Sequence, residues 1–135
     1  MKYVLDCSVA LKTVLPEADS AKAIRLLMEY QQALHELIAP EVANGLATAE
    51  RQGRIKSGEA TILLHDIITN SPVIHSSIPL LARAVAVSVA HRQAVYDCIY
   101  LALAEEEVCE MVTADDAFFR KMKASFSFLV RLADL

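Results

Sequence analysis

Short apolar runs alternate with helical stretches along this chain, and this alternation limits the folds open to it more than any other feature. The first run, Tyr3–Leu5, ends at Asp6, and Leu37–Ala39 is stopped by Pro40. Short apolar runs bounded by polar or turn-forming residues are typical of buried strands. The pattern predicts five strands, at residues 3–5, 37–39, 72–74, 108–113 and 126–132.

Between the predicted strands, apolar residues recur at the spacing of a helix face. One such stripe is Ala23, Leu26, Leu27, Tyr30 and Leu34, and another is Ala60, Leu63, Leu64, Ile67 and Ile68. Further helices are predicted at residues 42–52, 80–91, 97–107 and 115–123. Gly53 suits the end of the first of these helices, and Ser57 suits the cap of the helix that follows.

Strands separated by helices predict an α/β fold with a short, mainly parallel sheet flanked by helices and right-handed crossovers. A length of 135 residues predicts a single domain over residues 1–135. An apolar content of 55% excludes intrinsic disorder. Sheets of this kind bind ligands at the carboxyl ends of their strands, near the point where the strand order reverses.

Charge, hydropathy and cysteine content exclude several classes of protein. A net charge of −4 excludes a strongly basic protein that holds nucleic acid by bulk electrostatics. The longest uncharged apolar stretch, residues 84–90, is far shorter than the roughly 20 residues that cross a bilayer. Cys7, Cys98 and Cys109 are few and odd in number, which fits free thiols in a reducing compartment. We therefore expect a soluble cytoplasmic protein with no membrane partner.

Acidic residues gather where the predicted strands end. Asp6 follows the first strand, Glu41 the second, and Asp115 and Asp116 the strand that ends at Thr113. Taken singly, each fits a helix cap or a first-turn acid that the helix dipole favours. Taken together, they predict a group of carboxylates at one edge of the sheet.

Asp97 joins this group from the front of a predicted helix, where it shares one face with Tyr100, Leu101 and Ala104. A carboxylate at the end of an apolar stripe is costly to bury ionised unless a cation meets it. Mg²⁺ and Mn²⁺ take carboxylate oxygens and remove the repulsion between them. Without Asp6, Glu41, Asp97 and Asp115, the rest of the chain is formally neutral. The pattern predicts a metal site suited to phosphodiester hydrolysis.

Four segments in this order resemble the PIN-domain ribonucleases, and within them the VapC-like toxins of bacterial type II toxin–antitoxin systems. They are YVLDCSVALKTVLPE with Asp6 and Ser8, EVANGL with Glu41 and Asn44, VYDCIYLALAEE with Asp97, and VTADDAFFRK with Thr113 and Asp115. The resemblance covers nearly the whole chain.

The resemblance implies a PIN-like three-layer fold and a Mg²⁺- or Mn²⁺-dependent endoribonuclease acting on an RNA substrate. It also implies a homodimer and a cognate antitoxin protein that inserts a segment near the active site. Asp6, Asp97 and Asp115 match the family's metal-binding acids. Glu41 matches the glutamate expected to position the nucleophilic water or a second ion, so the expected catalytic residues are Asp6, Glu41, Asp97 and Asp115.

One feature departs from the family pattern. Family members have several residues between the proline that ends the second strand and the glutamate, whereas Pro40 here directly precedes Glu41. Either a loop is shortened here or residues are absent; a shortened loop would pull Glu41 away from the other acids, and Glu41 nevertheless stays among the expected catalytic residues.

Other polar residues have two interpretations each. Ser8 and Thr113 bond to the carboxylates or to a scissile phosphate, or else they cap helices. Asn44 bonds Glu41 or the substrate, or is merely a polar helix residue, and Asp116 is interpreted as an exposed first-turn acid. The basic residues Arg51, Arg54, Lys56, Arg120, Lys121 and Lys123 either touch RNA phosphates or, as we prefer, line solvated helix faces.

Two alternatives to the ribonuclease stay open at this stage. A receiver domain is also α/β with an acidic Mg²⁺ pocket, but it needs paired acids after the first strand, where Cys7 and Ser8 follow Asp6. A catalytically inactive PIN-like scaffold would bind RNA or protein without cutting. The apolar stretches at residues 80–89 and 24–30 fit a homodimer interface or an antitoxin groove, or in the first case a buried central helix.

Overall fold

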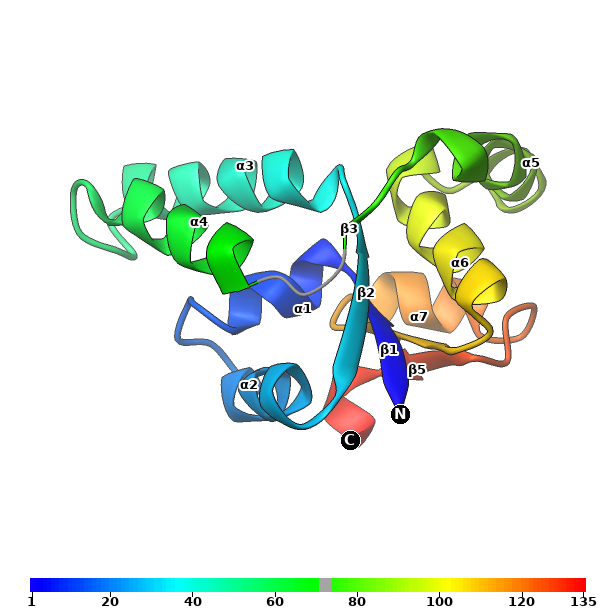
Figure 1. Cartoon of the computed structure of the whole chain (residues 1–135), viewed down its shortest axis with the longest axis horizontal. Helices are drawn as coiled ribbons and strands as arrows, with labels where there is room; N and C mark the ends of the chain where they lie inside the picture. The colour runs from blue at the N-terminus through cyan, green and yellow to red at the C-terminus, as the bar shows by residue number, and fades with distance from the viewer. Residues whose placement is uncertain (71–73) are drawn as a thin grey trace.

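The computed structural model describes residues 1–70 and 74–135, in which strands and helices alternate as expected (Figure 1). The strands are β1 (Lys2–Leu5), β2 (Gln31–His35), β3 (Ile74–His75), β4 (Glu110–Thr113) and β5 (Leu129–Arg131). The helices are α1 (Cys7–Lys12), α2 (Ser20–Glu29), α3 (Ile38–Arg51), α4 (Glu59–Asn70), α5 (Leu81–His91), α6 (Val95–Glu107) and α7 (Asp116–Met122). Two short 3₁₀ turns are η1 (Ile78–Leu80) and η2 (Leu132–Asp134).

The five strands form one parallel sheet in the order β3-β2-β1-β4-β5. Val4 of β1 lies opposite Ala33 of β2 on one side and Met111 of β4 on the other. Because the chain moves outward through β2 and β3 before returning to β4, the strand order reverses between β1 and β4. The prediction of an α/β fold with a parallel sheet is confirmed.

Helices cover both faces of the sheet, which gives the predicted three layers. Figure 1 shows α1 and α2 on one side of β1 and β2, with α6 and α7 on the other. Helix α6 packs along β1, β2 and β4, and α5 lies across α6. Residues 98–104 of α6 are all buried, as are the last three residues of β1 and of β4. The ends of these elements are therefore held in fixed positions around the strand-order reversal.

The second strand and the helix after it differ from the prediction. The strand is Gln31–His35, and Leu37–Ala39 begins α3 instead. Pro40 is the third residue of that helix, where its missing N–H removes no helical hydrogen bond. Residues 36–40 therefore separate the end of β2 from Glu41, and the predicted short junction does not exist.

Several element boundaries also shift. Ser57 does not begin α4 as expected; the N–H groups of Gly58 and Ala60 donate to Glu50 Oε1 at 2.9 and 3.0 Å. Strand β5 is shorter than predicted, and β4 begins at Glu110 because Val108 caps the end of α6. In the predicted strand 72–74, Ile74 lies in β3, whereas Pro72 and Val73 lie outside the described residues.

Gly45 lets α1 and α3 approach closely. A Cβ at this position would lie 2.6 Å from Leu11 Cδ1 and 2.9 Å from Leu11 Cδ2, distances that packed side chains do not tolerate. Gly45 lies one turn after Glu41, and Leu11 lies in the helix that Asp6 caps. The close contact therefore draws two of the predicted site residues toward each other.

In the described part of the chain, no helix has both the length and the apolar character needed to cross a membrane.

Candidate active site

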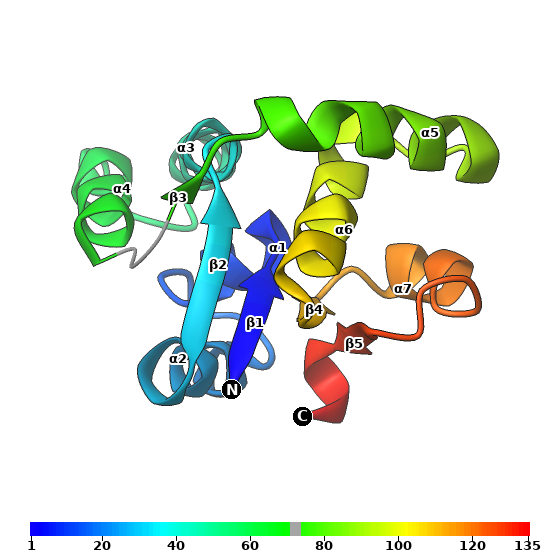
Figure 2. The same ribbon diagram turned by 45° about the vertical axis from the view of Figure 1, so that its right-hand side comes forward.

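The four predicted acids meet in one small pocket at the carboxyl ends of β1 and β4. Asp6 lies between β1 and α1, and Asp115 lies between β4 and α7. Glu41 lies in the first turns of α3 and Asp97 in the first turn of α6. Figure 2 shows the starts of these two helices near the end of β1. The pocket has a volume of about 60 Å³ and is lined by Asp6, Cys7, Ser8, Glu41, Asp97, Tyr100, Asp115 and Phe118.

Asp6 is held rigidly by donors from two segments. Its Oδ1 accepts hydrogen bonds from the Val9 N–H at 3.1 Å and from the Ser8 hydroxyl at 2.5 Å. Its Oδ2 accepts a hydrogen bond from the Thr113 hydroxyl at 2.5 Å. Asp6 is thus both the N-cap of α1 and a buried carboxylate fixed against β4.

The same two hydroxyls also hold the chain that follows β4. Ser8 Oγ accepts from the Ala114 N–H at 2.9 Å, and Thr113 Oγ1 accepts from the Asp115 N–H at 3.1 Å. These bonds decide between the two interpretations of Ser8 and Thr113, because both side chains bond to a carboxylate. They connect Asp6 to the backbone at Asp115, so the two acids keep a fixed relation.

Glu41 enters the pocket from α3, despite the expectation that it would be displaced. Its Oε2 accepts a hydrogen bond from the Tyr100 hydroxyl across 3.3 Å. Its Oε1 is buried and has no hydrogen-bond partner within the described residues. A buried carboxylate oxygen without a partner is costly, which marks it as a ligand position for a cation or a water.

Asp97 and Asp115 form the more open side of the pocket, because both residues are exposed. Asp115 caps α7 by accepting the Phe118 N–H at Oδ1, 3.0 Å away. Asp116 lies outside the pocket lining and forms an ion pair with Arg131 at 3.5 Å, as expected for an exposed first-turn acid. Asn44 is exposed and is also absent from the lining.

Burial and mutual repulsion disfavour the charged forms of these acids. Burial raises the pKa of Asp6 to about 6, against hydrogen bonds from Ser8 and Thr113 that lower it. The pKa of Glu41 is raised to about 7, chiefly by burial; the hydrogen bond from Tyr100 lowers this pKa, and the nearby Asp97 and Asp6 charges raise it. The pKa of Asp97 is also raised, by burial and by Asp115. The charged neighbours that shift these three pKa values are themselves acids, so a bound cation would relieve the repulsion between them.

The structure adds three lining residues to which sequence reasoning gave no role in the site. Tyr100 was placed only on the Asp97 face, and its position three residues after Asp97 was the available signal. Phe118 and Cys7 line the pocket and also belong to, or pack against, the hydrophobic core. Burial raises the pKa of the Cys7 thiol to about 12, so the thiol is neutral at physiological pH.

The chemistry of the lining fits a hard divalent cation. Carboxylate oxygens are the ligands that Mg²⁺ and Mn²⁺ prefer. Glu41 Oε1 is a buried oxygen of this type that has no hydrogen-bond partner among the described residues. Within residues 1–70 and 74–135, no three histidine, cysteine or acidic side chains already stand in an arrangement that would hold an ion. Binding an ion therefore requires the carboxylates to converge from their present positions.

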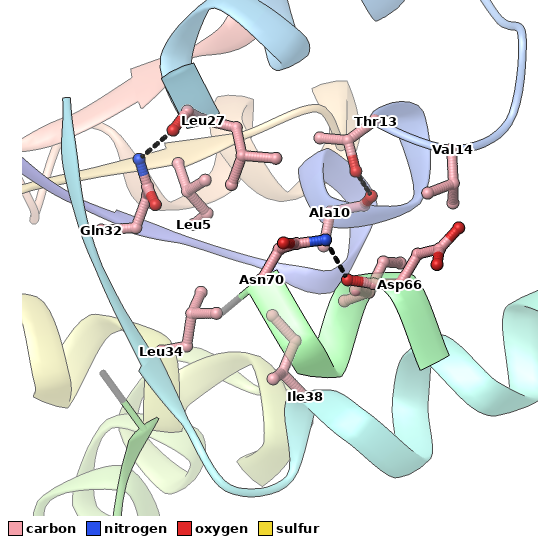
Figure 3. Close-up of a pocket in the computed structure, with 11 residues that line it drawn as sticks. Leu5, Ala10, Thr13, Val14, Leu27, Gln32, Leu34, Ile38, Asp66 and Asn70 are labelled. Atoms are coloured by element: carbon pink, nitrogen blue, oxygen red, sulfur yellow. Dashed lines mark hydrogen bonds between the residues drawn. The ribbon is translucent and has the colours of Figure 1, made fainter. Parts of the chain in front are cut away.

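A larger cavity, of about 120 Å³, lies on the other side of α1 and is of a different kind. Figure 3 shows that its lining is mostly aliphatic, with Leu27, Leu34 and Ile38 around it. Its polar side chains already donate within the fold: Gln32 to Leu27, Thr13 to Ala10 and Asn70 to Asp66. Such a cavity suits an apolar group and not the chemistry of a phosphodiester.

Known proteins share both the sequence pattern and the fold. Residues 3–124 match the family model of the PIN domain. The chain is 34% identical over 128 residues to Ribonuclease VapC3 of Pyrobaculum aerophilum, which covers 92% of this chain and 97% of that protein.

Solved structures with low sequence identity share the fold. The PAE2754 protein of Pyrobaculum aerophilum has a TM-score of 0.75 at 20% identity, over 99% of this chain and 85% of that chain. A toxin–antitoxin complex from Klebsiella pneumoniae has a TM-score of 0.68 at 17% identity, over 96% and 97% of the two chains. VapBC2 from Rickettsia felis, bound to a DNA fragment from its promoter, has a TM-score of 0.64 at 14% identity, over 97% of each chain. With the family model spanning most of its length, this chain belongs to the PIN-domain family.

Proposed function

We propose that this protein is a divalent-metal-dependent endoribonuclease and the toxin of a toxin–antitoxin pair. The observation that carries the proposal is the pocket of four carboxylates from four different elements, in which Glu41 Oε1 has no hydrogen-bond partner among the described residues. The 34% identity to a protein named as a ribonuclease supports the same chemistry. We propose Asp6, Glu41, Asp97 and Asp115 as the catalytic residues.

Asp6, Asp97 and Asp115 would hold Mg²⁺ or Mn²⁺, and Glu41 would act on water. Such an ion supplies Lewis acidity toward the scissile phosphate and offsets the repulsion between the carboxylates. Glu41 has a pKa of about 7, so at neutral pH it is able to accept a proton from an attacking water. The hydroxyls of Ser8 and Thr113 hold Asp6 in place by donating hydrogen bonds to its carboxylate.

An inactive PIN-like scaffold is the alternative, and metal binding separates the two. All four acids line one pocket, whereas a scaffold has no need to gather mutually repelling carboxylates. A scaffold would bind RNA or protein equally well in EDTA.

We propose an antitoxin protein as the binding partner, with one of its apolar side chains filling the cavity beside α1. Its lining is mostly aliphatic, so an apolar side chain that enters it is removed from water. Leu27 lines it from α2 and is itself partly exposed, so the cavity is reachable from outside. One of the similar solved structures, from Klebsiella pneumoniae, is described as a toxin–antitoxin complex. A Leu27→Glu variant should lose antitoxin binding and keep RNA cleavage.

We further propose a homodimer that forms through α5, and a cytoplasmic location. Helix α5 buries Ala84 and Val87 against the core, while an apolar stripe at Ile78, Leu81, Val85 and Val89 is exposed. A second copy would cover this stripe. Cys7, Cys98 and Cys109 are free thiols, which suits a reducing compartment. Light scattering of a Val85→Lys variant should report monomers.

The metal site is tested with a pair of adjacent acids. Mn²⁺ binding, followed by electron paramagnetic resonance, should weaken at least tenfold in Asp115→Asn and stay unchanged in Asp116→Asn. Both changes remove one charge, but only Asp115 lines the pocket. Equal weakening in both variants would mean that the chain attracts Mn²⁺ through its overall charge. Cleavage of RNA in Mn²⁺ should follow the same order.

A further inference from the structure

Tyr96 is an exposed aromatic residue next in sequence to Asp97, which lines the pocket. It precedes Asp97 in the first turn of α6, and 61% of its surface is open to solvent. Tyr100, one turn later on the same helix, is only 1% exposed and bonds Glu41 inside the pocket. Packing in the core explains why residue 100 is aromatic, but it does not explain an aromatic side chain at the exposed position 96.

Helix geometry places Tyr96 at the rim of the pocket. Residues four apart on a helix are neighbours on its surface, so Tyr96 lies one turn above Tyr100, which forms part of the pocket wall. Its neighbour Asp97 also lines the pocket. A molecule whose reacting bond lies at the acids has its adjoining atoms within reach of this ring.

Hydrogen bonds fix the turn that leads into the start of α6, where Tyr96 lies. Ser88 Oγ donates to the Gln93 carbonyl at 2.5 Å, and Gln93 Nε2 donates to the carbonyls of His91 and Arg92 at 3.3 and 3.1 Å. These bonds fasten the end of α5 to the start of α6. An aromatic ring on a fixed helix end loses little conformational entropy when a flat partner stacks on it.

We propose that Tyr96 is a substrate-positioning residue, on which one unpaired base of RNA stacks beside the scissile phosphate. The inference rests on the proposed ribonuclease function and assigns one side chain, Tyr96, to hold the RNA beside the bond that is cut. Bases in a duplex are paired and stacked on one another, whereas unpaired bases are free to stack on aromatic side chains.

Electrostatics explains why such a residue is needed. The chain carries a net charge of −4, and the pocket itself is acidic, so phosphates gain little from bulk charge attraction. Base stacking does not depend on charge and tolerates any sequence. Stacking on Tyr96 would supply affinity that the acidic surface does not.

Binding to a labelled random-sequence RNA decamer tests the proposal by fluorescence anisotropy in Ca²⁺, with gels of the same samples to monitor cleavage. Tyr96→Ala should weaken single-strand binding about 5- to 150-fold, and Tyr96→Phe should retain it, because the ring is what stacks. Val108→Ala is the matched control, since Val108 is 90% exposed at the opposite end of α6. Wild-type protein that binds the decamer no better than its duplex form would overturn the proposal.

A spectroscopic readout reports stacking directly. The chain contains no tryptophan, so Tyr96→Trp introduces a single indole. Its fluorescence should be quenched by the single-stranded decamer and not by the duplex. An unchanged spectrum in a variant that binds the single strand would overturn the stacking geometry.

Cleavage kinetics separate this inference from the proposed function. In Mn²⁺, Tyr96→Ala should raise KM about 5- to 150-fold with kcat nearly unchanged, because stacking binds substrate and transition state alike. If the wild type cleaves and the variant's KM is unchanged, the inference fails while the ribonuclease stands. If the wild type does not cleave, the function fails and the binding data still decide the inference. A change in oligomeric state in Tyr96→Ala would make Tyr96 an interface residue and overturn it.

Discussion

The hydroxyl of Tyr100 donates to Glu41 Oε2 across 3.3 Å and thereby ties α6 to α3 inside the acidic pocket. Burial, together with the negative charge of Glu41, keeps the pKa of the Tyr100 hydroxyl far above the ordinary value, so the hydroxyl remains a donor. The bond occupies one oxygen of Glu41, while the other, Oε1, has no hydrogen-bond partner among the described residues. Tyr100 thus orients the carboxylate that is proposed to act on water.

Tyr100→Phe should lower kcat of RNA cleavage about tenfold, because a hydrogen bond to a charged group contributes about 1.5–3 kcal/mol and this one is long. Single-turnover cleavage in Mn²⁺ measures the effect. Tyr3→Phe is the matched control, since the Tyr3 hydroxyl contacts the Met1 sulfur, away from the acids. Equal rates in Tyr100→Phe and wild type would show that Tyr100 does not orient Glu41 for cleavage.

Thr113→Val should destabilise the fold by about 1–3 kcal/mol, because it deletes the donor to Asp6 Oδ2 and the acceptor of the Asp115 N–H in a fully buried position. Urea unfolding measures the change. Thr113→Ser keeps the hydroxyl and should lose much less. The Mn²⁺ affinity of Thr113→Val should also fall, since Asp6 loses a bond that favours its charged form. A valine variant as stable as wild type would show that the hydroxyl bonds contribute little.

The metal-free protein should become less stable as pH rises from about 4 to about 7. Asp6 and Glu41 have pKa values of about 6 and 7 in the fold, above their ordinary values of 3.8 and 4.5. In that window the folded state holds more protons than the unfolded chain, so the free energy of unfolding falls as pH rises. Thermal unfolding in EDTA at pH 5 and pH 7.5 checks the direction.

Mn²⁺ should reverse this trend, because it stabilises the charged carboxylates of the folded state alone. The Tm gained from Mn²⁺ should be large at pH 7.5 and small at pH 5, where protons compete for the same oxygens. Glu41→Gln should flatten the pH dependence in EDTA, whereas Asp116→Asn, outside the pocket, should leave it unchanged. A protein that is most stable at pH 7.5 without metal would contradict the burial of these acids.

Val108→Gly should stabilise the fold by about 1 kcal/mol, or about 3 °C in Tm. Val108 caps α6 with φ +50° and ψ +51°, a left-handed conformation that a β-branched residue adopts at a cost, and its side chain is 90% exposed. Differential scanning calorimetry measures the gain. Val108→Ala retains a Cβ and should gain less, so the order Gly, Ala, Val in falling stability is the expected result, with cleavage activity unchanged.

The order of strands and helices was predictable because most boundaries between these elements depend on residues close to them in the sequence. The failure at β2 has a physical cause. Leu34 falls at a helical spacing from Ala23, yet Gln31–His35 pairs with β1, a partner that only the tertiary fold supplies. Pro40 was interpreted as a stop, but proline is tolerated in the first turn of a helix. The same error produced the false expectation that Glu41 would be displaced.

The candidate site divides in the same way. The positions of Asp6 and Asp115 follow from strand ends, since the carboxyl ends of parallel strands lie at one edge. Tyr100 and Phe118 reach the pocket only through tertiary packing, in which α6 lies against β1, β2 and β4 and α7 against β5. No spacing in the sequence encodes that packing. The unpaired Oε1 of Glu41 is likewise visible only in three dimensions.

The most direct measurement is cleavage of total RNA by the purified protein and by Asp97→Asn, each in Mn²⁺ and in EDTA. Asparagine keeps the shape of the side chain and removes the charge that Asp97 brings to the pocket. We expect the wild type to cleave RNA in Mn²⁺ and not in EDTA. The cleavage rate should fall at least a hundredfold in Asp97→Asn, whose thermal stability should be equal or higher. Equal cleavage by the two proteins, or cleavage that persists in EDTA, would contradict the carboxylate site.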